Sequence, residues 1–170
     1  MVSSEQIAEV LKNHEQDGIS DVIVGYNGRV GSLLKSRFDP NRSYVLLVHC
    51  LTDECILRFR VSGLAGVRLD GKVTEALSWA NLCFFSGGLG IDSENTVTFE
   101  VNHPCRVDDD NDPSPQVFEK LMDGLLNDIG EIEMIIMSAV LCDMGLSGKR
   151  VDNIMGILFP DSHYAADKAK

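Results

Sequence analysis

The sequence predicts one α+β domain in which helices pack on an antiparallel sheet. Three observations predict it: an amphipathic helix near the amino terminus, a series of strand-like segments, and a long apolar helix around residue 130. Strands that are grouped between helices, rather than alternating singly with them, are typical of the α+β class. A chain of 170 residues with 44% apolar and 24% charged residues is ordinary for one folded domain.

The first helix is indicated by both of its ends. Residues 3–6 (Ser-Ser-Glu-Gln) have the form of a capping box, in which Ser3 and Gln6 each bind the backbone of the other. Apolar residues between positions 7 and 14 then share one helical face, and Gly18 ends the segment. We therefore expect a short helix at the start of the domain.

A strand-rich region follows the first helix. Its strand-like stretches are residues 21–26, 29–34, 44–50 and 55–61. Asn27-Gly28 separates the first two stretches, and this pair is the strongest short hairpin signal because both residues tolerate positive φ. In the last stretch Arg58 and Arg60 alternate with apolar residues, so the two arginines should share one face of the sheet.

The second half of the chain predicts a helix, a hairpin and a longer helix. The helix runs from Lys72 to Phe84, and the hairpin has its arms at 89–91 and 96–101. Pro115, which follows the capping residue Ser114, opens the long helix. From residue 134 to 141 this helix is apolar around its whole circumference, so it has to be covered on all sides.

The sequence also indicates the domain organisation of the chain and its location in the cell. We expect one domain over residues 1–144, with a carboxy-terminal extension, 145–170, packing on it. No secretory signal and no membrane-length apolar run is visible. The five cysteines form an odd number and suit free thiols in a reducing compartment. The expected location is the cytoplasm.

The net charge of −11 limits the classes of partner. An acidic surface repels phosphate backbones and anionic headgroups, so nucleic acids and membranes are poor candidates. A protein or peptide partner, possibly a basic one, is the better match. The charge is equally well explained by solubility alone.

Reactive and metal-binding patterns are weak. No nucleophile elbow, HExxH motif or phosphate loop occurs. The acidic residues 108–112 have the spacing of a calcium loop, but Pro113 stands where such a loop needs glycine. We therefore expect no catalytic residue, cofactor or metal. The alternative is a small thiol- or metal-dependent enzyme built from His49, Cys50, Cys55 and His103.

Candidate interface residues come from two places. Arg58 and Arg60 either pair with Glu100 or another acid of the sheet, or hold a carboxylate or an acidic segment of a partner. The second place is the apolar surface of the long helix, at Ile132, Ile135, Ile136, Ala139 and Val140. Either the core and the carboxy-terminal extension cover this surface, or a second subunit does, as in a homodimer.

A resemblance to a known family appears in the middle of the chain. The segment from Ala76 to Phe85, the glycine-rich stretch 87–92 (Gly-Gly-Leu-Gly-Ile-Asp) and the strand from Thr96 to Val101 have a layout similar to the YbjN-type family of bacterial sensory transduction regulators. The resemblance covers residues 70–142 in pattern and the earlier part in element order only. It implies a fold like that of type III secretion chaperones, with the order α-β-β-β-α-β-β-α.

The resemblance also implies a function. Members of such a family are non-enzymatic, often dimeric domains that bind protein segments or modulate regulation. For this chain we therefore expect a chaperone-like or regulatory adaptor of a bacterial cytoplasm, without cofactor. The hairpin at Asn27-Gly28 and residues 145–170 depart from the family layout.

Overall fold

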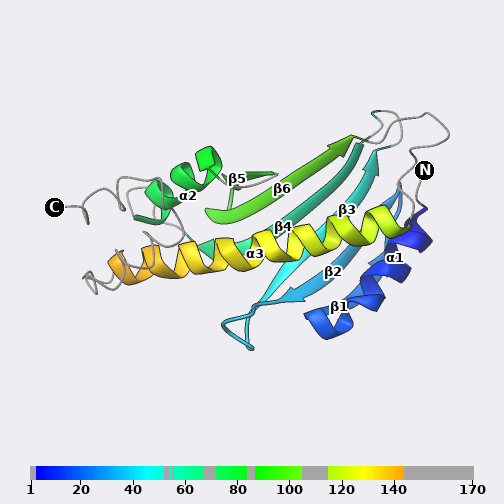
Figure 1. Cartoon of the computed structure of the whole chain (residues 1–170), viewed down its shortest axis with the longest axis horizontal. Coiled ribbons are helices and arrows are strands. Elements are labelled where there is room, and N and C mark those ends of the chain that lie inside the picture. The colour runs from blue at the N-terminus through cyan, green and yellow to red at the C-terminus, as the bar shows by residue number, and fades with distance from the viewer. Residues whose placement is uncertain are drawn as a thin grey trace.

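A computed structural model describes residues 3–51, 54, 56–66, 72–83, 87–104 and 115–143. These residues form three α-helices, a short 3-10 helix and a six-stranded antiparallel sheet (Figure 1). The bounds are α1 Ser4–Asn13, η1 Glu15–Asp17, β1 Ile19–Val24, β2 Arg29–Lys35, β3 Ser43–Leu51, β4 Ile56–Gly66, α2 Lys72–Cys83, β5 Gly88–Ile91, β6 Thr96–Pro104 and α3 Pro115–Asp143. The α+β class predicted from the sequence is confirmed.

The expected element order is corrected by one strand. Four strands, not three, lie between α1 and α2, so the order is α-β-β-β-β-α-β-β-α. The reason is the Asn27-Gly28 turn: its two arms pair with each other as β1 and β2, with Val24 opposite Val30 and Ile19 opposite Leu34. The extension at 145–170 and the acidic residues 108–112 lie outside the described residues.

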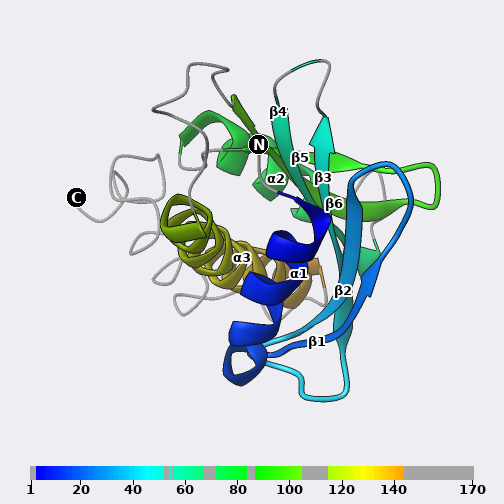
Figure 2. The same cartoon turned by 90° about the vertical axis from the view of Figure 1, so that its right-hand side faces the viewer.

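The sheet has its helices on one side. Its strand order is β1-β2-β3-β4-β6-β5, with every neighbouring pair antiparallel. Figure 2 looks along the molecule and shows α1 and α3 on the same side of the strands, with α3 running across the sheet in Figure 1. The apolar core lies between that side of the sheet and the helices. Phe59 of β4 and Phe118 of α3 meet there with ring centroids 5.6 Å apart.

The local signals read from the sequence act as expected. Ser3 caps α1 and completes the capping box with Gln6, and the two hydrogen bonds are 2.9 and 3.2 Å long. Asn27 and Gly28 have φ values of 59° and 72°, the positive values that a tight hairpin turn requires. Because each signal involves only a few neighbouring residues, tertiary packing did not override it.

Two strands are interrupted by bulges. In β1 the pairing shifts between Ser20 and Ile23, where Asp21 has a φ of 53°. In β4 it shifts between Ser62 and Gly66, where Gly63 has a φ of 84°. Bulges leave backbone groups without their ladder partners. The carbonyl groups of the β4 bulge are bound by an arginine of the loop that joins β2 to β3, described below.

One side chain of α2 binds the backbone of β5 in the manner of a strand. The amide of Asn81 accepts a hydrogen bond from the N–H of Leu89 at 2.6 Å. The same amide donates to the carbonyl oxygen of Leu89 at 2.8 Å. This two-way contact fixes the start of the hairpin against the helix that precedes it.

Candidate functional site

The face of the sheet turned away from the core is a candidate binding surface. We call it the outer face and define it by the outward positions of β2, β3, β4 and β6. These positions are Arg29, Gly31, Leu33, Lys35, Ser43, Val45, Leu47, His49, Leu51, Ile56, Arg58, Arg60, Ser62, Thr98, Glu100 and Asn102. The assignment follows from alternation, because the residues between them, such as Val30, Leu46 and Phe59, are buried in the core.

Four aliphatic side chains lie together on this side of the sheet. Ile23, Leu33 and Val45 are 68%, 37% and 54% exposed, and Leu47 is half-buried. The register makes them neighbours: Leu33 faces Val45, while Ile23 and Leu47 both pair with Gly31. We call these four residues the aliphatic patch. At Gly31 an added Cβ would meet nothing within 4 Å, so the patch has open space at its centre.

Charged residues border the aliphatic patch. Leu47 pairs with Arg60, and the positions at the two ends of β2 are Arg29 and Lys35. Two residues before Arg60 on the same face of β4, Arg58 donates a hydrogen bond to the side chain of Asn102 at 2.9 Å and lies 3.3 Å from the carboxylate of Glu100. The predicted pairing with Glu100 is therefore confirmed for Arg58.

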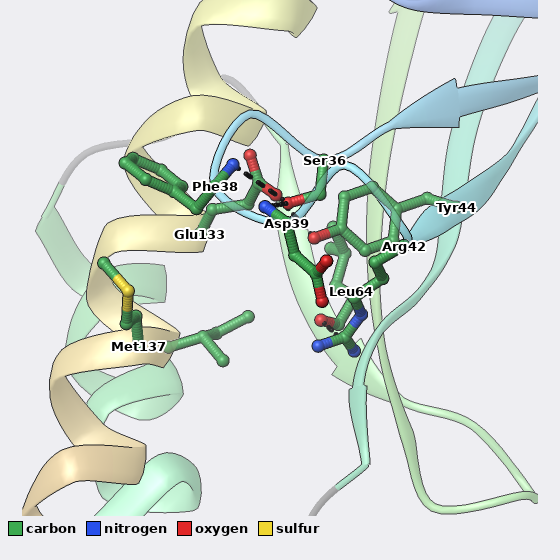
Figure 3. Close-up of a pocket in the computed structure, with 9 residues that line it drawn as sticks. Ser36, Phe38, Asp39, Arg42, Tyr44, Leu64, Glu133 and Met137 are labelled. Carbon is green, nitrogen blue, oxygen red and sulfur yellow. Dashed lines mark hydrogen bonds between the residues drawn. The ribbon is translucent and has the colours of Figure 1, made fainter.

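A pocket of about 220 Å³ lies on the other side of the sheet, between α3 and the loop that joins β2 to β3 (Figure 3). Its lining residues are Ser36, Phe38, Asp39, Arg42, Tyr44, Leu64, Glu133, Ile136 and Met137. Glu133 of α3 is only 6% exposed. Its carboxylate accepts a hydrogen bond from the hydroxyl of Tyr44 at 2.5 Å and another from the backbone N–H of Arg37 at 3.3 Å.

Arg42 and Arg37 hold the loop in place at the pocket. The Arg42 guanidinium donates through Nη2 to the bulge carbonyls of Gly63 and Leu64, at 3.2 and 2.7 Å, and lies over the Tyr44 ring. Arg37 packs on α3 so closely that a Cβ at Gly130 would lie 2.6 Å from its Nη1. The loop is thus bound to both the helix and β4.

The polar groups of the pocket are suited to structure rather than to reaction. Burial and the hydrogen bond to Glu133 raise the pKa of Tyr44 from 10.0 to about 12. At neutral pH the phenol therefore keeps its proton and donates a hydrogen bond to the carboxylate. A protonated phenol cannot serve as a base or nucleophile. Asp39 is engaged in turning the loop, since its carboxylate accepts from the N–H of Asn41 at 3.0 Å.

The residues of the alternative enzyme do not converge where they are described. His49 lies on the outer face, and its ring nitrogen Nε2 is 3.1 Å from the carbonyl oxygen of Asn27. Cys50 points to the core side, where burial raises the pKa of its thiol. Cys50 and His103 pair with opposite sides of Leu57, which places their backbones about 10 Å apart, two strand spacings. Cys55 lies outside the described residues.

Side chains that could bind a metal ion are also scattered in the part of the chain that the structure describes. Within the described ranges, no three His, Cys, Asp or Glu side chains lie close enough together to hold a metal ion.

The candidate interface residues of the long helix lie in the core. Ile132, Ile135, Ile136 and Ala139 are 0–5% exposed in the single chain. These four side chains are already covered without a second subunit, which favours the core explanation that the sequence left open. The side chain of Val140 is outside the part of the structure that is described.

Sequence reasoning missed both the aliphatic patch and the Glu133–Tyr44 pair. A signal for the patch existed: residues 44–48 of β3 are apolar at every position, so Val45 and Leu47 had to lie on the second face. A signal for Glu133 existed as well, because it is a single acid at the start of an apolar helical stretch. Its partner had no local signal, since Tyr44 is 89 residues away.

Comparison of the chain with protein-family models, curated proteins and solved structures finds no match. Among the helices of the described residues, none combines the length and hydropathy needed to cross a bilayer.

Proposed function

We propose that this chain is a non-enzymatic protein-binding domain, a chaperone-like or regulatory adaptor of a bacterial cytoplasm. One observation carries the proposal: the aliphatic patch is exposed on the side of the sheet that the described helices leave uncovered. Adjacent apolar side chains on an otherwise charged surface mark interaction sites more often than isolated ones do. The partner would bind to the outer face, leaving the core and the helices in place.

Two further points support the proposal. The layout of residues 70–142 is similar to that of the YbjN-type regulators, whose fold resembles the type III secretion chaperones; this resemblance implies a domain that binds protein segments or modulates regulation. In addition, the buried thiol of Cys50 and the phenol of Tyr44 both have raised pKa values, which disfavours them as nucleophiles at neutral pH.

Site-specific photocross-linking tests the proposed function. A photoreactive amino acid replaces Val45 in the aliphatic patch, and in a control protein it replaces Glu9, which is exposed on α1. In extract of the cells of origin we expect a discrete adduct from position 45 and none from position 9. The adduct should disappear when Gly31→Trp fills the centre of the patch.

The mass of the adduct identifies the kind of partner. An adduct of twice the chain mass means that a second copy occupies the outer face. Equal labelling from positions 45 and 9, or labelling at 45 that persists in the Gly31→Trp protein, would refute the outer face as the binding surface.

A further inference from the structure

We infer that the outer face binds an acidic amphipathic helix of its partner. This inference rests on the proposed function and specifies the chemistry of the partner. It reverses the expectation drawn from the net charge, which favoured a basic partner. Total charge describes the average field around a protein, whereas the side chains at a contact decide which groups bind there.

The local charges of the outer face are cationic in an acidic chain. The outward positions of β2, β3, β4 and β6 carry four cations, Arg29, Lys35, Arg58 and Arg60, against one carboxylate, Glu100, which is already paired with Arg58 at 3.3 Å. The hydrogen bonds from Thr96 are the main reason that the pKa of the Asp92 carboxyl group is lowered, and the charge of nearby Arg60 adds a smaller effect. The chain as a whole carries −11, so the acid surplus comes from other residues than these. Carboxylates of a partner therefore find complementary charge on this face.

The geometry of the aliphatic patch suits one helix. The patch extends over β1, β2 and β3, which is about 10 Å across at ordinary strand spacing, and a helix with its side chains has about the same diameter. Arg29, Lys35 and Arg60 stand around this strip. A helix with an apolar stripe flanked by glutamates would bury its stripe on the patch and direct its acids toward these cations.

Nucleic acids and anionic membranes are less suitable occupants. The outward positions of β2, β3 and β4 include no Phe, Tyr or Trp on which bases could stack. The charge of −11 on the whole chain also repels a long phosphate polymer or an extended anionic surface. A single short helix carries few charges and stays close to the cations, so it is affected least by the distant acids.

Designed peptides provide the direct test. The probes are three helical peptides with the same leucine stripe and with glutamate, glutamine or lysine at the flanking positions. Binding to the full chain is measured by fluorescence anisotropy at low and high salt. We expect the glutamate peptide to bind at least about tenfold more tightly than the lysine peptide, with the difference shrinking as salt rises.

Charge-reversal variants localise the effect. Arg60→Glu should weaken binding of the glutamate peptide by roughly tenfold and strengthen binding of the lysine peptide. Lys12→Glu on α1 is the matched control, because it makes the same change in net charge at an exposed site on the helical side of the sheet. Gly31→Trp should block all three peptides, since nothing in the folded chain opposes a side chain there.

The possible outcomes separate the inference from the proposed function. Equal binding of the three peptides, with loss in Gly31→Trp, would refute the acidic partner and leave the outer face as a docking surface. Tighter binding of the lysine peptide, or an equal effect of Arg60→Glu and Lys12→Glu, would also refute it. So would preferential binding of vesicles rich in phosphatidylserine or of single-stranded DNA, and so would failure of every peptide to bind.

Discussion

Raising the pH should weaken this protein through the ionisation of Tyr44. Burial and the hydrogen bond to Glu133 raise the pKa of Tyr44 from 10.0 to about 12. Between these two values the unfolded chain loses the phenolic proton while the folded chain keeps it, so stability falls as pH rises. Two pKa units at 1.36 kcal/mol each amount to a loss of about 2.7 kcal/mol by the time pH passes 12.

The Tyr44→Phe variant isolates this loss from the effects of other groups. At neutral pH the variant should be less stable by about 1.5–3 kcal/mol, because the buried carboxylate of Glu133 loses a hydrogen bond. Between pH 10 and 12 the wild type should approach the variant, since only the wild type has this phenol to ionise. The gap should narrow by about 2 kcal/mol between pH 10 and 12 and by about 2.7 kcal/mol in total above pH 12, so a neutral-pH gap smaller than this should change sign.

Urea unfolding followed by circular dichroism, at several pH values from neutral to alkaline, measures the gap. Tyr26→Phe serves as the control, because Tyr26 is 94% exposed and its removal should leave the pH dependence of the wild type unchanged. A gap between wild type and Tyr44→Phe that stays constant across the alkaline range would refute the reasoning. The reasoning would also be refuted if the alkaline loss of stability seen in the wild type disappeared in Tyr26→Phe.

Three further changes test single features of the fold, each by the urea midpoint of the variant. Ser32→Ala should leave stability unchanged or raise it by up to about 1 kcal/mol, because the buried Oγ has no hydrogen-bond partner; a clear drop would point to a bond that the structure lacks. Ser3→Ala should cost about 1 kcal/mol by opening the capping box, and an unchanged midpoint would mean that the helix end is frayed. Ile132→Ala should cost about 2–5 kcal/mol at any protein concentration, against far less for the exposed Met137→Ala; a concentration-dependent loss would instead indicate a subunit interface.

The parts of the fold predicted from the sequence are those with local causes. The capping box at Ser3, the Asn27-Gly28 turn and the opening of α3 at Pro115 each involve a few neighbouring residues. The sequence predicted that helices pack on an antiparallel sheet, but it did not predict the order of the strands within that sheet. The expected order lacked one strand because the family layout has three strands before the second helix, whereas the Asn27-Gly28 turn of this chain gives it a fourth.

The candidate site was predicted only in part, because its contacts join distant segments. Arg58 and its partner Glu100 were found because strand alternation puts both on one face. The same alternation applied to Val45 would have found the aliphatic patch. No sequence rule could find the contact of Glu133 with Tyr44, since it depends on where α3 crosses the sheet.

Asn81 has a consequence for how this sheet ends. An exposed edge strand offers its N–H and C=O groups to any other chain, and such edges promote aggregation. On β5 both backbone groups of Leu89 are already bound by the Asn81 amide. With the backbone groups of Leu89 occupied, this four-residue strand is a poor template for a further strand, so a side chain of α2 protects the β5 edge of the sheet.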